Sequence, residues 1–242
     1  MMRGAVVNEV PAGIFVNGER VAIGTCSPDA LDLWAIGRLS TEGYITSVAD
    51  VRSIAVHGND HARTVQVELP LPAAQNGEAE RRHRAYTGCG VLHCLECAPH
   101  LLKRTRSLGI PDAARLTELY RKLFESGAAH RETGGMHSAA LTDGERLLFI
   151  AHDVGRHNAV DKVIGASIAN GAVAGGLGLV LTSRISGEIA AKAGRAGISW
   201  IASRSVPTTL AVRIAERAGM PLIGRAAGKD LYVHEPPPDA AS

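Results

Sequence analysis

Apolar and polar residues alternate in short runs through the first quarter of the chain, and this pattern predicts β-strands. Residues 14–16 and 21–23 are apolar and flank Asn17-Gly18, so we predict a β-hairpin there. Ser27-Pro28-Asp29 has the residue types that begin helices, and we predict a helix capped by Ser27. Two further strands are predicted, at residues 44–56 and 64–69.

The second half of the chain has a more regular pattern. Helical periodicity predicts an amphipathic helix over residues 113–126, which ends before Gly127. The strands predicted beyond it lie at 136–141, 147–151, 177–181, 198–202 and 222–223, and the helices at 158–169, 186–196 and 207–218. Strands that alternate with helices predict parallel pairing with right-handed crossovers, and ligands usually bind at the carboxyl ends of such strands.

These elements predict an α/β fold in two parts. Residues 1–105 form a smaller N-terminal α+β region that ends in a cysteine-rich loop. Residues 106–235 form a C-terminal α/β domain, in which helices flank a mixed sheet. Residues 236–242 begin with three prolines, and we predict that they are a disordered tail.

Composition narrows the functional classes. The 242 residues are 45% hydrophobic and 21% charged, which excludes wholesale disorder, and the net charge of +2 is too small to indicate nucleic-acid binding. No apolar run approaches the roughly 18 residues of a membrane span. The first residues lack the pattern of a secretory signal. We therefore expect a cytoplasmic protein with reduced thiols that binds neither membranes nor nucleic acid.

Three of the four cysteines, Cys89, Cys94 and Cys97, lie within nine residues. Clustered thiols in a reducing compartment indicate reactive sulfur or a metal site before they indicate disulfides. The arginine-rich segment 81–84 favours a reactive loop, because nearby cations lower the pKa of a thiol. Two alternatives remain open. The cysteines form a metal site that a nearby histidine or Cys26 completes, or they belong to a purely structural loop.

Four further polar segments, at residues 133–137, 152–162, 183–188 and 224–230, lie where predicted strands begin or end. Backbone amides at the start of a helix bind anions, and arginine adds positive charge. We therefore predict that His137, Arg156 and Arg184 contact a polar or anionic ligand. In the last segment two cations and two glycines suit a diphosphate, and a carboxylate there can accept from a guanine edge. The alternative for the first segment is a structural histidine, and for the others it is a capped helix or turn with solvated charges.

Taken together, these segments resemble the FdhD family of formate dehydrogenase accessory sulfurtransferases. The resemblance extends over about residues 10–234, and its most specific string is DVGRHNAVDK at residues 153–162. The other matching motifs are Thr87-Gly88-Cys89-Gly90, Thr133-Gly134-Gly135-Met136-His137-Ser138-Ala139-Ala140, Ser183-Arg184-Ile185-Ser186-Gly187-Glu188 and Pro207-Thr208-Thr209-Leu210-Ala211.

The resemblance implies a C-terminal part like that of cytidine deaminases and a homodimer. It implies that persulfide sulfur is accepted from a cysteine desulfurase and passed to the molybdenum of bis-molybdopterin guanine dinucleotide, which then enters formate dehydrogenase. The family's persulfide cysteine maps onto Cys89, and Cys94 or Cys97 is expected to act as a relay or resolving thiol. Its cofactor-binding stretch, for which GDP is the expected mimic, maps onto Arg225, Ala226, Ala227, Gly228, Lys229 and Asp230.

The cysteine loop departs from the family pattern of two cysteines separated by two residues. Leu92 stands three positions after Cys89, whereas Cys94 and Cys97 form a pair with the family's spacing. Two alternatives to sulfur transfer therefore remain open: a chaperone that binds the cofactor without moving sulfur, and a metal-binding module on the cysteine loop. We assign no metal ligands. The sequence argues against a deaminase, because the chain lacks the His-x-Glu and Pro-Cys-x-x-Cys signatures of zinc deaminases.

Overall fold

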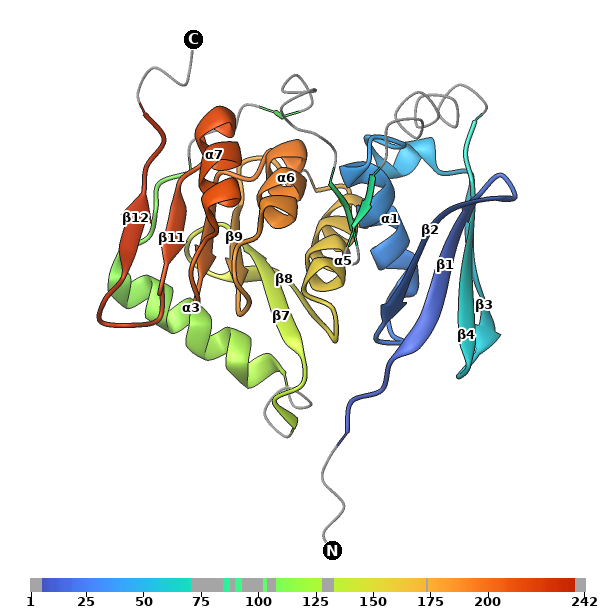
Figure 1. The fold of residues 1–242 in the computed structure, drawn as a ribbon, viewed down its shortest axis with the longest axis horizontal. Helices are drawn as coiled ribbons and strands as arrows, with labels where there is room; N and C mark the ends of the chain where they lie inside the picture. The colour runs from blue at the N-terminus through green and yellow to red at the C-terminus, as the bar shows by residue number, and fades with distance from the viewer. Residues whose placement is uncertain are drawn as a thin grey trace, which may run out of the picture.

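The computed structural model describes residues 6–70, 85–87, 90–92, 102–103, 108–127, 133–172 and 174–237. Over these ranges the chain forms two mixed β-sheets, a short hairpin and five α-helices (Figure 1). The predicted α/β class is therefore confirmed, whereas the likeness to cytidine deaminases and the two domain boundaries stay predictions. Most of the predicted tail, residues 238–242, lies outside the described residues.

The N-terminal sheet has the strand order β2-β1-β4-β3, in which β1 and β4 are parallel and the other pairs are antiparallel. Its strands are β1 (Val10–Val16), β2 (Glu19–Cys26), β3 (Ser53–Asn59) and β4 (Ala62–Glu68). The predicted hairpin is confirmed, and Asn17 and Gly18 have the positive φ angles, 49° and 84°, that a tight hairpin turn requires. Helix α1 (Leu31–Thr41) packs on one face of this sheet, where Trp34 and Leu39 are fully buried.

The prediction that Ser27 caps the first helix is wrong. Helix α1 begins at Leu31, and its N-cap is Ala30 in the left-handed conformation. Ser27 instead contacts the C-terminal part. Its hydroxyl accepts a hydrogen bond from the backbone N–H of Val154, and its own N–H donates to the carboxylate of Asp153. These long-range bonds replace the local cap.

The strand predicted over residues 44–56 is also wrong in its first half. These residues form a turn, the 3₁₀ helix η1 (Val48–Asp50) and then the start of β3. The carboxylate of Asp50 accepts hydrogen bonds from the backbone N–H groups of Thr46 and Ser47. Such local side-chain bonds compete with strand pairing and favour turns.

The C-terminal sheet has the strand order β12-β11-β10-β9-β7-β8. Its strands are β7 (His137–Thr142), β8 (Leu147–Asp153), β9 (Gly178–Leu181), β10 (Trp200–Ser203), β11 (Leu222–Gly224) and β12 (Tyr232–His234). β9, β10 and β11 are parallel, as the alternation of strands and helices predicts. β12, which the sequence pattern does not predict, adds an antiparallel edge strand.

Helices cover both faces of this sheet (Figure 1). Helices α5 (Arg156–Ala169), α6 (Gly187–Ala196) and α7 (Thr209–Ala218) pack on one face. On the other face lies α3 (Ala113–Ser126), which has the bounds predicted from its periodicity. None of the described helices has the length and apolar character of a membrane-spanning helix.

The two parts of the chain meet along α1 and α5, which lie side by side between the sheets (Figure 1). Gly37 and Gly165 make the close approach possible. A Cβ atom on Gly37 would lie 1.8 Å from the carbonyl oxygen of Asp161, and one on Gly165 would lie 1.9 Å from that of Leu33. Because glycine lacks a Cβ, the two backbones can touch, and polar side chains of the two parts are brought together.

Candidate functional site

One edge of the C-terminal sheet collects the ends of several strands. β9, β10 and β11 end there, whereas β7 runs antiparallel to β9 and begins there. The pairing of Ala139 with Leu181 and of His137 with Asp153 places the end of β8 at the same edge. We call it the carboxyl edge, and ligands of open α/β sheets usually bind at this position. His137, a predicted ligand-binding residue, is half-buried there.

Arginines follow four of the strands that meet at the carboxyl edge. Arg156 follows β8, Arg184 follows β9, Arg204 follows β10 and Arg225 follows β11. Arg156 is half-buried and the other three are exposed. Within the described ranges, the side chains of Arg156 and Arg184 form no hydrogen bond or ion pair. The structure thus places the predicted cations along the same edge of the sheet. Arg204, which the same rule of a strand followed by a polar residue would have found, also follows a strand there, and its guanidinium carbon lies 5.2 Å from the centroid of the Phe124 ring on α3.

The turn after β11, residues 225–230, is anchored by its first two residues. The N–H of Arg225 donates to the carbonyl oxygen of Ser205 at 2.8 Å, and the N–H of Ala226 donates to that of Ser203 at 2.9 Å. Ala226 is buried, and Arg225 has a left-handed φ of 51°. The side chain of Ala226 therefore holds the turn against the sheet, whereas residues 228–230 are exposed.

The remaining residues of this turn are accessible. Ala227 is half-buried, whereas Gly228, Lys229 and Asp230 are exposed. A guanidinium nitrogen of Arg225 lies 3.9 Å from a carboxylate oxygen of Asp230, a loose contact between two solvated groups. The turn therefore presents two cations and one carboxylate to solvent, next to the arginines of the neighbouring strands.

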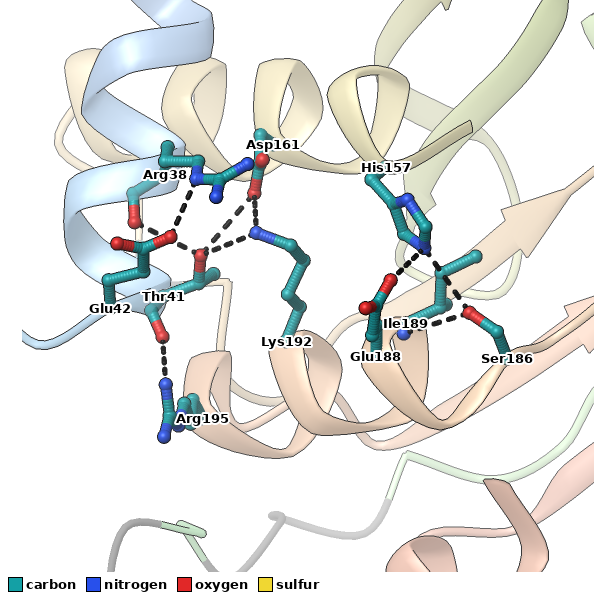
Figure 2. Close-up of polar contacts among 10 residues, drawn as sticks. All are labelled: Arg38, Thr41, Glu42, His157, Asp161, Ser186, Glu188, Ile189, Lys192 and Arg195. Atoms are coloured by element: carbon teal, nitrogen blue, oxygen red, sulfur yellow. Dashed lines mark hydrogen bonds and ion pairs between the residues drawn. The ribbon is translucent and has the colours of Figure 1, made fainter. Parts of the chain in front are cut away.

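A histidine and a glutamate form a buried pair near this edge, between α5 and α6 (Figure 2). Nε2 of His157 lies 2.9 Å from a carboxylate oxygen of Glu188 and 3.3 Å from the hydroxyl of Ser186. The same hydroxyl caps α6 by accepting a bond from the N–H of Ile189. In a Ser-His-acid triad the hydroxyl and the carboxylate use opposite ring nitrogens, so this geometry does not activate Ser186 as a nucleophile.

The 152–162 segment, predicted to bind a ligand, mostly joins the two parts of the chain instead. The ammonium group of Lys162 lies 2.7 Å from the carboxylate of Asp153, and these side chains are 1% and 0% exposed. Asp153 also accepts from the N–H of Ser27, and the amide of Asn158 donates to the carbonyl oxygen of Thr25. Of the residues predicted to bind a ligand, Arg156 is the one in this segment. Unlike these neighbours, its side chain forms no hydrogen bond or ion pair within the described ranges.

A second polar cluster joins α1, α5 and α6 (Figure 2). We call it the inter-helix cluster, and its members are Arg38, Thr41, Glu42, Asp161, Lys192 and Arg195. The ammonium group of Lys192 lies 2.7 Å from the carboxylate of Asp161 and 3.1 Å from the hydroxyl of Thr41. Burial lowers the pKa of Lys192, although the charge of Asp161 acts in the opposite direction.

The cysteines divide into one buried thiol and three that the structure does not describe. Cys26 is fully buried, and burial together with the charge of Asp153 raises the pKa of its thiol. Cys26 is therefore a protonated, poor nucleophile at neutral pH. The predicted sulfur-carrying residues Cys89, Cys94 and Cys97 lie outside the described residues.

The backbone on both sides of Cys89 is described. β5 (Ala85–Thr87) and β6 (Gly90–Leu92) pair as an antiparallel hairpin, and β6 contacts α6, the helix that carries Glu188 and Lys192. Among the described residues, no group of three histidine, cysteine or acidic side chains is placed to hold a metal ion. The metal-binding alternative for the cysteine loop stays untested, because its cysteines are not among those residues.

A model of the FdhD/NarQ family matches residues 7–238. The chain belongs to this family. It is 35% identical over 238 residues to the sulfur carrier protein FdhD of Bordetella petrii, an alignment that covers 96% of this chain and 85% of the relative. It is 33% identical over 240 residues to the sulfur carrier protein FdhD of Xanthomonas euvesicatoria, covering 96% and 84% of the two chains. The predicted family resemblance is confirmed.

A solved structure agrees with the fold of this FdhD/NarQ family member. The crystal structure of a protein assigned as a formate dehydrogenase accessory protein from Desulfotalea psychrophila superposes with a TM-score of 0.73. The superposition covers 97% of this chain and 89% of the other at 23% identity. This likeness extends over both parts of the chain and supports the fold, while it assigns no activity.

Proposed function

We propose that this chain is a sulfur carrier in the maturation of formate dehydrogenase. It accepts persulfide sulfur from a cysteine desulfurase and delivers it to the molybdenum of bis-molybdopterin guanine dinucleotide, the substrate that the carboxyl edge binds. Family membership and curated relatives named sulfur carrier proteins support the proposal. The observation that carries it is the carboxyl edge, where an arginine follows each of four strand ends.

The loading step requires a thiolate on the carrier. The thiolate of Cys89 attacks the outer sulfur of the desulfurase persulfide, forms a persulfide on Cys89 and releases the desulfurase cysteine as a thiolate. One S–S bond forms and another breaks, so the step consumes no oxidant. Cys26 is unsuited to this step, because its buried thiol has a raised pKa.

The release step uses a second thiol of the loop. A thiolate of Cys94 or Cys97 attacks the inner sulfur of the Cys89 persulfide, forms a disulfide with Cys89 and releases the outer sulfur as hydrosulfide for the metal. The two cysteines supply the two electrons that reduce the transferred sulfur. An external thiol must then reduce the disulfide before the next cycle, and the reducing cytoplasm provides one.

The charge of the carboxyl edge suits the substrate. Each of its two guanine nucleotides carries a diphosphate, and guanidinium groups such as those of Arg184 and Arg225 bind phosphate oxygens through paired hydrogen bonds. His137 and Arg156 lie at the β7–β8 end of the same edge. In a two-fold homodimer, each subunit would offer one such edge to one nucleotide.

A chaperone that binds the cofactor without moving sulfur is the second candidate. Leu92 stands where the family that the chain resembles has its second cysteine, so Cys89 lacks a partner at the usual spacing. In this candidate the carboxyl edge keeps its role and the cysteine loop has no chemical one. The two candidates therefore differ only in what the three cysteines do.

Activation of formate dehydrogenase by cysteine variants distinguishes the two candidates. Cells that lack their own carrier receive the wild-type chain, Cys89→Ala, Cys94→Ala, Cys97→Ala or the matched control Cys26→Ala. We expect loss of formate dehydrogenase activity with Cys89→Ala and with at least one other loop variant, and full activity with the control. Wild-type activity in all three loop variants would overturn sulfur transfer and favour the chaperone.

A further inference from the structure

The outermost strand of the C-terminal sheet holds a tyrosine ring beside the exposed turn. Tyr232 of β12 pairs with Gly224 of β11, directly before Arg225. The phenol ring occupies the space that a side chain on Gly224 would need, because a Cβ atom there would lie 2.3 Å from the ring carbon Cζ and 2.5 Å from the hydroxyl oxygen. The ring is therefore held against the backbone of the neighbouring strand.

A histidine completes a corner with this tyrosine. The ring of His234 stands at 86° to that of Tyr232, with centroids 5.3 Å apart. Because side chains alternate along a strand, both rings lie on one face of β12 and Val233 lies on the other. Tyr232 is half-buried and His234 is exposed, so the corner is open to solvent. Shielding of a glycine by an aromatic neighbour accounts for the tyrosine but not for the histidine.

We propose that Tyr232 and His234 bind the purine base of a guanine nucleotide whose diphosphate lies on the 225–230 turn. This inference rests on the proposed function and names the residues that read the base. Tyr232 follows Asp230 by two residues and pairs with Gly224, so the corner lies directly beside the turn that carries the exposed carboxylate and the two cations.

The chemistry of each group matches one part of the nucleotide. Two aromatic rings at right angles offer a face for stacking and an edge for a T-shaped contact with a flat base. The carboxylate of Asp230 accepts from the N–H donors on the Watson–Crick edge of guanine, which adenine lacks at the same positions. The guanidinium of Arg225 and the ammonium of Lys229 bind the diphosphate.

Calorimetric titration with GDP and with pyrophosphate tests the corner. Stacking of a base on an aromatic side chain is worth roughly 1–3 kcal/mol, so we expect Tyr232→Leu and His234→Leu to weaken GDP binding at least about fivefold. Pyrophosphate, which has no base, is expected to bind all variants with wild-type affinity. Tyr232→Phe keeps the ring and is expected to retain GDP affinity, as is Val233→Thr, the matched control on the opposite face of the strand.

The outcomes separate this inference from the proposed function. Unchanged GDP affinity in His234→Leu and in folded Tyr232→Leu overturns the base-binding role of the two rings, while it leaves a nucleotide site on the turn intact. A parallel loss of pyrophosphate affinity also overturns it, because the variants would then act on the turn rather than on the base. Failure of the wild-type chain to bind either GDP or pyrophosphate overturns the nucleotide site of the proposed function itself.

Discussion

The contact between the two parts of the chain and the carboxyl edge are both polar, but their polar groups have different surroundings. At the contact, Lys162 and Asp153 are excluded from water and each has a charged partner. At the edge, Arg184 and Arg225 are exposed and have weak protein partners or none among the described residues. A buried charge is costly to leave without its partner, so the buried pair is needed for stability. The exposed cations have no such buried partner within the described part of the chain and are available to an anionic ligand.

One segment contributes residues to both regions, so the two can be compared within a single motif. Residues 153–162 run from the end of β8 into α5, and Asp153, Asn158 and Asp161 turn inward to the other part of the chain. Arg156, in the same helical turn as Asn158, is half-buried at the carboxyl edge. Polar residues of one motif thus lie either in the contact between the two parts or at the carboxyl edge, according to the direction in which they face.

The largest effect is expected from Lys162→Met. The substitution leaves the fully buried carboxylate of Asp153 without its cationic partner, and breaking a buried pair in this way costs about 3–5 kcal/mol. Urea unfolding measures the loss. Lys122→Met on the exposed face of α3 is the matched control and should change the free energy of unfolding by less than about 0.5 kcal/mol. Equal effects of the two substitutions would contradict the assigned role of the buried pair.

Lys192→Met in the inter-helix cluster is expected to cost about 3 kcal/mol, because Asp161 stays buried without its ammonium partner. The double variant Asp161→Asn with Lys192→Met removes both charges and should be more stable than Lys192→Met alone. Urea unfolding of the wild type, Lys192→Met, Asp161→Asn and the double variant gives the coupling free energy between the two residues. A coupling near zero would show that the short contact does not stabilise the fold.

The inter-helix cluster makes the free energy of unfolding depend on pH in a direction that can be predicted. Because the pKa of Lys192 is lower in the folded chain than its ordinary value of 10.5, the folded state binds fewer protons between the lowered pKa and 10.5. The free energy of unfolding therefore gains a contribution that rises with pH through this window. In Lys192→Met that contribution should be absent, and an identical alkaline profile of wild type and variant would argue against it.

Gly37→Ala is expected to cost about 1–3 kcal/mol. A Cβ atom at this position would overlap the carbonyl group of Asp161, so α1 and α5 would have to move apart. Thermal unfolding measures the loss. Gly109→Ala is the matched control, since a Cβ atom there would meet nothing within 4 Å. A stability loss as large at Gly109 would show that the close helix contact is not the cause.

The smallest effect on stability and a clear effect on binding are expected at the carboxyl edge. Arg184→Ala and Arg225→Ala should change the free energy of unfolding by less than about 0.5 kcal/mol, because both side chains are exposed. Each should weaken GDP binding about tenfold, the loss of one charge-assisted contact. Unchanged affinity in Arg225→Ala, with calorimetry as the measurement, would contradict the nucleotide site.

The sequence pattern predicted a helix, strand or turn correctly where neighbouring residues alone determine it. The bounds of α3 and the turn at Asn17-Gly18 follow from periodicity and turn residues alone. The Ser27 cap failed because a partner from residues 153–154, far along the chain, binds that side chain instead. The three-residue strand β12 exists only because β11 offers it a pairing edge.

The sequence predicted where the candidate site lies, but only some of the residues that form it. A rule that places ligands after parallel strands found Arg184 and the 225–230 turn, and it applies equally to Arg204, which was omitted. The rule could not separate Arg156 from Asp153 and Asn158, since all three lie between the end of β8 and the first turn of α5. Which of them faces inward depends on the packing of α1 against α5, a contact between segments far apart in the sequence.

Mass spectrometry of the chain after incubation with a cysteine desulfurase and cysteine is the most direct test of the sulfur-carrier account. The account predicts a mass gain of about 32 Da, one added sulfur atom, on a peptide that contains Cys89, Cys94 or Cys97. The peptide with the buried Cys26 should stay unmodified. An adduct confined to Cys26, or no adduct on any cysteine under conditions in which the desulfurase is loaded, would contradict the account.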